Sequence, residues 1–117
     1  MIQYSDKYGA YVFETNSIIF CWDEKPGEDA EKIATRTADF YLKNIDNIAQ
    51  YIFDEIQDTF EVSDIKEVKE KIGRPKINIE NGQVTYCEQQ FDDMHIFSFE
   101  YMDDEFQELV YFAIDGW

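Results

Sequence analysis

The sequence has few of the side chains that enzymes most often use for catalysis. It contains two cysteines and a single histidine, His95. A zinc site needs three or four Cys or His ligands, so this supply argues against a zinc centre. A catalytic triad would have to use His95, which alternates with Phe97 and Phe99 and is therefore expected on the face of a strand. We expect no catalytic residue and no bound metal.

Motifs for phosphate groups, calcium ions and cofactors are also missing. The five glycines are scattered and form no phosphate-binding loop. The acidic runs 92–93 and 103–105 lack the alternating spacing that places carboxylates around calcium. Any two of the 26 acidic residues could still meet as a glycosidase pair, and no feature of the sequence favours this. We therefore predict a non-catalytic protein without a cofactor.

Signals for export or membrane insertion are not evident. The chain begins Met-Ile-Gln-Tyr-Ser-Asp, which has neither the basic start nor the apolar run of a secretory signal. No stretch approaches the roughly 18 apolar residues of a membrane-spanning helix. These features predict a cytoplasmic protein in which Cys21 and Cys87 stay reduced.

Positive charge is scarce and unevenly placed. Ten basic residues face 26 acidic ones, giving a net charge of −16, and half of the basic residues lie in residues 66–76. Residues 77–117 contain ten acidic side chains and no lysine or arginine. This charge would repel nucleic acids and anionic membranes and would attract a basic protein. It also fits a surface that is acidic only for solubility, and both interpretations stay open here.

Apolar residues are plentiful and predict a folded chain. Hydrophobic residues make up 44% and aromatic residues 17% of the sequence, more than disordered chains contain. Residues 9–14 and 17–22 are rich in strand formers and predict a hairpin with a tight turn at Thr15-Asn16. An earlier short strand is predicted at residues 2–5. Pro26-Gly27 marks the loop that follows the hairpin.

Two or three helices are expected in the middle of the chain. Apolar residues repeat at helical spacing over residues 30–60. Asn44 and Asp46 interrupt the stripe with side chains that prefer helix caps. We predict two helices, or one kinked helix, with either residue as the second N-cap. A short third helix is predicted over residues 64–72, capped by Ser63.

The remaining residues predict a series of strands joined by short turns. Asn81-Gly82 is typical of a type I′ hairpin turn. Residues 94–101 alternate between two faces. Residues 106–115 predict the last strand, which is apolar on both faces between Leu109 and Ile114 and is therefore expected to be central. We predict one α+β domain spanning residues 1–117, with a mostly antiparallel sheet of five or six strands and the helices on one face. No parallel βαβ unit is indicated.

The pattern as a whole resembles small acidic immunity proteins that bacteria produce against polymorphic and contact-dependent toxins. The resemblance covers the whole chain: its size, its charge, the order of its elements and the closing residues 111–117, Tyr-Phe-Ala-Ile-Asp-Gly-Trp. It implies a stoichiometric inhibitor that binds one toxin in the cytoplasm, with a nuclease as one candidate. It assigns no role to any single residue, because such proteins are diverse.

The charge pattern predicts a binding surface for a basic protein, formed by the second helix and the ends of the last strands. The side chains expected there are Asp54, Asp58, Glu61, Asp92, Asp93, Tyr101, Asp103, Asp104, Glu105 and Trp117. Carboxylates would speed association, and an exposed aromatic side chain would slow dissociation. Two alternatives stay open: a nucleic-acid mimic that blocks a DNA-binding protein, and an enzyme or small-ligand domain with an unrecognised pocket.

Overall fold

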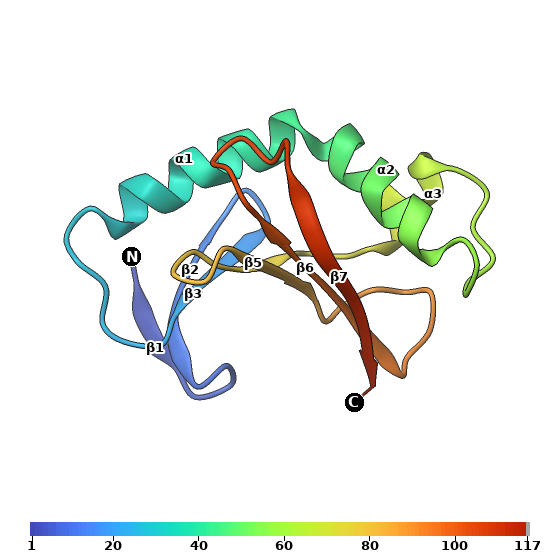
Figure 1. Cartoon of the computed structure of the whole chain (residues 1–117). Helices are drawn as coiled ribbons and strands as arrows, with labels where there is room; N and C mark the ends of the chain where they lie inside the picture. Colours follow the sequence, from blue (N-terminus) through green and yellow to red (C-terminus); the bar gives the residue numbers. More distant parts are fainter. Residues whose placement is uncertain (117) are drawn as a thin grey trace.

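The computed structural model describes residues 1–116 and, within that range, has three helices over one face of a seven-stranded sheet (Figure 1). The predicted α+β class is confirmed, with seven strands in place of five or six. The elements in chain order are β1 (Gln3–Ser5), β2 (Ala10–Thr15), β3 (Ile18–Trp22), α1 (Ala30–Lys43), α2 (Ile45–Ile56), α3 (Ile65–Lys71), β4 (Lys76–Asn78), β5 (Gln83–Tyr86), β6 (His95–Tyr101) and β7 (Leu109–Gly116). None of the helices in this part of the chain is long and apolar enough to cross a membrane.

The strands lie side by side in the order in which they occur along the chain. Every neighbouring pair is antiparallel except β3 and β4, which are parallel, with Phe20 opposite Ile77. The sequence indicated no parallel pair, and this was wrong. All three helices lie in the connection between β3 and β4, so the chain returns to the sheet in the same direction.

The helix-covered face of the sheet carries large apolar side chains. Phe20, Tyr86 and Phe97, from three different strands, are fully buried and share one cluster with Ile52 of α2. Tyr41 reaches the sheet from the end of α1, where its hydroxyl lies 2.6 Å from that of Tyr86. Burial raises the pKa of both phenols, so both stay neutral and hydrogen-bonded.

Asn44 separates α1 from α2, as one of the two predicted caps. Its side-chain amide donates a hydrogen bond to the Phe40 carbonyl oxygen at 2.9 Å, which closes the end of α1. Its own carbonyl accepts the first hydrogen bond of α2 from the Ile48 N–H at 3.0 Å. The two helices therefore follow one another along the sheet as a bent arch (Figure 1).

The N-cap of α3 is Asp64, one residue after the predicted Ser63. The Asp64 carboxylate accepts a hydrogen bond from the Glu67 N–H at 3.0 Å. Glu67 in turn accepts one from the Ser63 N–H at 2.8 Å. Asp64 is the better cap because a charged oxygen faces the positive end of the helix dipole.

A turn with type I′ conformation occurs at Asn16-Ser17, one residue along from the predicted tight turn. Both residues have positive φ, 52° and 63°, as this turn requires. The prediction of a type I′ turn at Asn81-Gly82 was wrong. Strand pairing ends at Asn78 opposite Gln83, which leaves a four-residue loop. The Asn78 side chain accepts a hydrogen bond from the Asn81 N–H at 3.2 Å, and this local bond stabilises the longer loop.

β7 lies at the edge of the sheet, although the sequence predicted a central last strand. It begins at Leu109, and Phe106 belongs to the preceding loop, where it is fully buried. One face of β7 packs on α2 through Phe112, whose ring centroid lies 6.0 Å from that of Tyr51. On the strand, Tyr111 sits in a bulge with φ of 59° and is 72% exposed. The apolar residues on both faces of β7 therefore do not mean that β7 has a hydrogen-bonded strand at each of its two edges.

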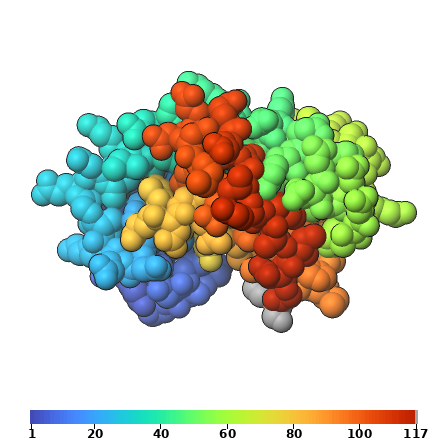
Figure 2. All heavy atoms as spheres, in the orientation of Figure 1, coloured from blue at the N-terminus to red at the C-terminus, as the bar shows by residue number. Residues whose placement is uncertain are grey.

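The molecule is elongated, with principal extents of 42 × 28 × 22 Å. The space-filling view shows the N-terminal strands, in blue, standing apart from β7, in red, with residues of the β4–β5 hairpin, in yellow, between them (Figure 2). Side chains on the surface of the N-terminal and C-terminal halves are therefore spread along the 42 Å length of the molecule.

Candidate functional site

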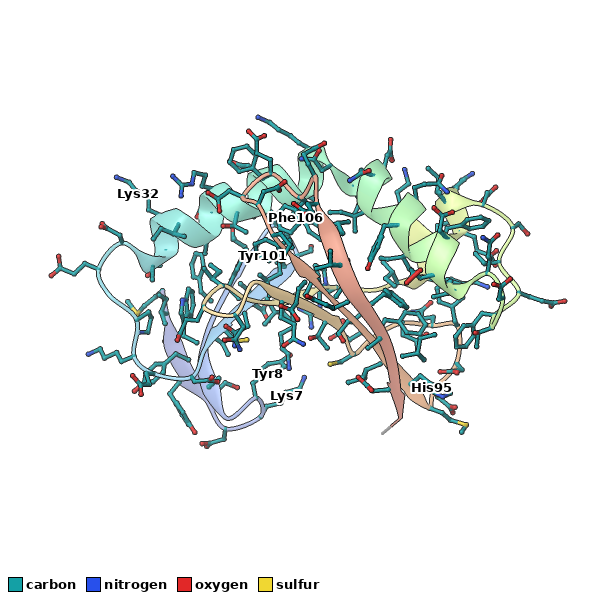
Figure 3. All side chains as sticks on the ribbon, viewed as in Figure 1. Lys7, Tyr8, Lys32, His95, Tyr101 and Phe106 are labelled. Carbon is teal, nitrogen blue, oxygen red and sulfur yellow. The ribbon has the colours of Figure 1, made fainter. Side chains whose placement is uncertain are left out.

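The predicted binding residues of the last strands fall at opposite ends of β6. Tyr101 and Phe106 lie at one end of this strand, and His95 lies at the other (Figure 3). Residues 103–105 follow the first end, and Asp92-Asp93 precede the second. A strand of seven residues is about 20 Å long, so the two acidic groups are separated by the length of the strand.

The acidic residues of the second helix lie nearer to one of these groups. Asp58 and Glu61 follow α2, on either side of Phe60. The Phe60 ring centroid lies 6.1 Å from that of His95. This contact brings Asp58 and Glu61 to the same end of the molecule as Asp92, while Asp54 lies one helical turn earlier on α2. Asp54, Asp58 and Glu61 are all exposed.

The Asp92 carboxylate is engaged within the fold. It accepts hydrogen bonds from the His95 ring at 2.6 Å, from the Gln89 amide at 3.0 Å and from the backbone N–H groups of Met94 and His95 at 3.1 Å. Burial raises its pKa, but these hydrogen bonds outweigh that effect and lower the pKa to about 2. Asp92 therefore holds a loop together, whereas the neighbouring Asp93 is exposed.

Asp103 is also used inside its own turn. It accepts hydrogen bonds from the N–H groups of Glu105 at 3.1 Å and Gln107 at 2.9 Å. Asp104 and Glu105 are exposed and make no side-chain ion pair within residues 1–116. Of this acidic run, two carboxylates are thus free for a partner.

Tyr101, one of the two aromatic residues selected from the sequence, is half-buried. The Tyr101 ring lies 4.5 Å from that of Phe106, and burial together with the charge of Asp104 raises its pKa to about 12. Trp117 lies outside the described residues. The exposed aromatic side chain of this region is Tyr111, which sequence reasoning missed because alternation along a strand does not reveal a bulge.

His95 and Asp92 form a pair like the histidine and aspartate of a catalytic triad, with the His95 Nδ1 atom 2.6 Å from the Asp92 carboxylate. Cys87 lines the same hollow, of about 510 Å³, as His95 and Asp92. No hydrogen bond joins the Cys87 thiol to His95 in the described part of the chain. Cys21 and Cys87 are both free thiols, and burial raises the pKa of Cys21. Residues 1–116 also contain no group of three side chains placed to hold a metal ion.

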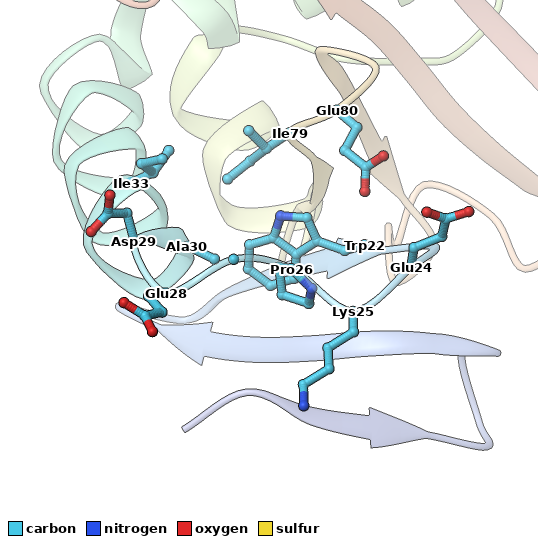
Figure 4. A pocket seen from close by; sticks show the side chains of 11 residues that line it. Trp22, Glu24, Lys25, Pro26, Glu28, Asp29, Ala30, Ile33, Ile79 and Glu80 are labelled. Atoms are coloured by element: carbon cyan, nitrogen blue, oxygen red, sulfur yellow. The ribbon is translucent and has the colours of Figure 1, made fainter.

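The hollow with the most distinctive lining lies at the other end of the chain, around Trp22 (Figure 4). Its volume is about 440 Å³, within the range of ligand pockets. We call it the Trp22 hollow. Its apolar surface comes from Trp22, which is 5% exposed, from Pro26, from Ile33 of α1 and from Ile79 of the β4–β5 loop.

Four carboxylates surround this apolar surface: Glu24, Glu28, Asp29 and Glu80. None of the four forms an ion pair within residues 1–116, and none accepts a hydrogen bond through its side chain there. Lys25 is the one basic residue that lines the hollow, and its side chain extends away from Trp22 toward β1 and β2 (Figure 4). The hollow therefore combines an apolar base with unneutralised negative charge.

Local sequence explains how these groups come together. Trp22 ends β3, and Pro26-Gly27 turns the chain so that the Ala30 N–H bonds the Gly27 carbonyl oxygen at 3.2 Å and α1 begins. Asp29 is the N-cap of α1, but its side chain makes no capping hydrogen bond. The signal in the sequence was an aromatic strand end followed by acidic residues. Trp22 belongs to the buried core, and the contribution of the distant β4–β5 loop to the hollow is not visible in the sequence.

Comparison with protein-family models, curated protein sequences and solved structures gives no match to this chain.

Proposed function

We propose that this chain is a non-catalytic immunity protein, acting in the cytoplasm, that binds and neutralises a cognate basic toxin. A nuclease is one candidate, because a nuclease must present a basic surface to its phosphate substrate. The observation that carries the proposal is the Trp22 hollow, where carboxylates without protein partners surround an apolar base. Such a surface complements a cationic side chain set within an apolar contact.

Net charge supports the same reading through association kinetics. The charge of −16 creates a negative field that accelerates encounter with a basic protein. Exposed carboxylates such as Asp93, Asp104 and Glu105 contribute to that field. Apolar contacts made after the encounter would then set the dissociation rate.

The distribution of acidic groups disfavours the nucleic-acid mimic. A mimic needs carboxylates spaced like phosphates along a rod. Here the acidic runs lie a strand length apart at the two ends of β6, and Asp92 and Asp103 are occupied by hydrogen bonds within the fold. A compact basic partner therefore fits this surface better than a protein built to bind duplex DNA.

The test is capture of a partner followed by assay of its toxicity. A tagged chain is used to isolate binding proteins from its native cell, and each candidate is purified and tested for direct binding. We expect a basic protein that forms an equimolar complex, with a dissociation constant in the nanomolar range, and that no longer kills cells when the two are co-produced. A partner whose toxicity is unchanged in the complex would overturn the proposal.

The electrostatic part of the proposal has a separate test, which leaves the turn at residues 103–107 intact. Asp104→Asn with Glu105→Gln removes two exposed charges and retains Asp103, which holds the turn. We expect the association rate with the toxin to fall about twofold to fivefold at low salt, with little change in the dissociation rate. An association rate that does not depend on salt or on this variant would mean that the acidic surface serves only solubility.

A further inference from the structure

We infer that the Trp22 hollow receives one arginine side chain of the basic partner, an inference that rests on the proposed function. The juxtaposition that carries it is an apolar base, a ring of free carboxylates and an indole N–H without an acceptor, all at one opening in the surface (Figure 4). Each of these three features selects a different part of an arginine residue.

The apolar base suits the aliphatic stem of a long side chain. Ile33 is 38% exposed although it lies on the side of α1 next to the hollow, and Ile79 is half-buried. Pro26 and Trp22 complete the apolar surface between them. Arginine and lysine both bury such a stem while their charged ends stay at a polar rim.

The four carboxylates at the rim of the hollow favour arginine over lysine. Glu28 and Asp29 lie at the start of α1, and Glu24 and Glu80 lie across the hollow from them (Figure 4). A planar guanidinium presents several N–H donors in fixed directions and can meet carboxylates from more than one side. It is also more weakly hydrated than an ammonium group and stacks on aromatic faces, such as the indole ring at the base of the hollow.

The indole of Trp22 supplies a donor for the backbone of the bound residue. Trp22 is 5% exposed, and its N–H has no hydrogen-bond acceptor within residues 1–116. No side-chain nitrogen or oxygen in that range is both fully buried and unpaired, so this N–H reaches solvent. Since Trp22 lines the hollow, a carbonyl oxygen of the bound segment could accept its hydrogen bond.

A second copy of the chain is a poor occupant. Two copies would each bring a net charge of −16 to the contact. The chain has two arginines, and the guanidinium of Arg74 is held by Glu88 at 2.8 and 3.0 Å. Arg36 lies on α1, the helix whose first turn forms part of the hollow. Charge complementarity therefore points to a different, basic protein.

The first experiment uses a short peptide, acetyl-Gly-Ala-Arg-Ala-Gly-amide, and a control in which citrulline replaces arginine. Citrulline keeps the shape of the side chain and removes its charge. Binding is followed by the NMR signal of the Trp22 indole N–H, assigned with the Trp117→Phe variant. We expect a saturable shift with the arginine peptide and binding about tenfold weaker with citrulline.

A matched pair of variants tests the position of the charge. Glu28→Gln with Glu80→Gln removes two carboxylates of the hollow, and Asp39→Asn with Glu70→Gln removes two exposed carboxylates elsewhere. The first pair should weaken the arginine peptide about tenfold and the second less than about twofold. Equal weakening by both pairs, equal binding of citrulline, or an unshifted Trp22 signal would overturn the inference. So would a dimer whose contact occupies the hollow.

The complex with the toxin separates this inference from the proposed function. If Glu28→Gln with Glu80→Gln leaves the toxin's affinity unchanged while the toxin remains neutralised, the arginine site is wrong and the immunity function stands. If the arginine peptide binds as expected and no captured basic protein is toxic, the hollow stands as an arginine site and the immunity function is wrong.

Discussion

Two acidic loops of similar length have opposite electrostatic characters in this fold. The 87–94 loop, between β5 and β6, uses its carboxylates internally. Glu88 pairs with Arg74 at 2.8 Å, and hydrogen bonding to this guanidinium lowers the pKa of Glu88. Asp92 accepts hydrogen bonds from both side chains and backbone. The negative charges of this loop are largely neutralised or solvated by the protein itself.

The 23–29 loop, between β3 and α1, does the reverse. Its carboxylates, including Glu24, Glu28 and Asp29, have no ion-pair or side-chain hydrogen-bond partner among residues 1–116. Because these charges have no ion-pair partner in the described residues, they repel one another. The number of acidic residues in a segment therefore does not measure its capacity to bind a cation; the number without internal partners does.

The largest effect on stability is expected from Gly73→Ala, because the added side chain would collide with the backbone of the 87–94 loop at Glu88. Gly73 has φ of +79°, and an added Cβ would lie 2.7 Å from the Glu88 carbonyl oxygen. The backbone strain alone costs about 1–3 kcal/mol, and the contact with the Glu88 backbone adds to it. We expect the free energy of unfolding in urea to fall by about 3 kcal/mol.

Gly27→Ala in the 23–29 loop is the matched control. Gly27 has no heavy atom within 4 Å of an added Cβ and does not have a positive φ. Its replacement should leave stability unchanged or raise it by about 0.4–1 kcal/mol, because the unfolded chain loses freedom. Equal losses at the two glycines would mean that the backbone conformation of Gly73 and its contact with Glu88 are not what makes this position sensitive.

A smaller loss is expected from Gln89→Leu. Gln89 is 6% exposed; its amide donates to the His95 carbonyl oxygen at 2.8 Å, and its oxygen accepts from the Phe91 N–H at 2.8 Å. Leucine would leave these groups unpaired, at a cost of about 2 kcal/mol in the free energy of unfolding. The exposed neighbour Gln90, replaced by Leu, should change stability by less than about 0.5 kcal/mol. A similar loss at both positions would show that the side-chain hydrogen bonds of Gln89 are not what holds the loop.

Local patterns in the sequence predicted elements whose determinants are local. The division of the helices at Asn44 follows from side-chain hydrogen bonding one turn back, to Phe40. The alternation of residues 94–101 gave β6 to within one residue. The spacing of Gln89, Asp92 and His95, three residues apart, was also a local signal for an internally bonded loop, and we overlooked it.

Features that depend on distant neighbours were not predictable in the same way. The apolar faces of β7 do not distinguish a strand packed on α2 from one with neighbours on both sides. The Trp22 hollow needs Ile79 and Glu80, which reach Trp22 only because the β3–β4 pair is parallel. The Arg74–Glu88 pair likewise joins segments on either side of a hairpin.

The stability of the fold should depend on pH through Asp92. Its pKa falls from about 3.8 in the unfolded chain to about 2 in the fold. A depressed carboxylate pKa stabilises the folded state fully above the unfolded value, and this contribution is lost as the pH falls through the folded value. Stability should therefore decline between about pH 4 and pH 2 in the wild-type chain.

Urea unfolding at a series of pH values, with Asp92→Asn as the variant and Asp93→Asn as the control, measures this contribution. The Asp92 variant should be less stable than the wild type at neutral pH, and the difference should shrink below about pH 3. The Asp93 variant should follow the wild-type curve, because Asp93 is exposed. Parallel curves for all three proteins would mean that Asp92 titrates as an ordinary surface carboxylate.

The smallest effect is expected in the Trp22 hollow, where Glu24 and Glu80 point toward the same side (Figure 4). Glu24→Gln with Glu80→Gln removes two like charges that have no internal partner to lose. We expect stability in urea to rise by no more than about 0.5 kcal/mol at low salt. The gain should vanish near 1 M salt, where the screening length is about 3 Å. The same variant should bind the arginine peptide more weakly. A loss of stability would instead mean that these carboxylates have partners within the fold, and the contrast between the two loops would not hold.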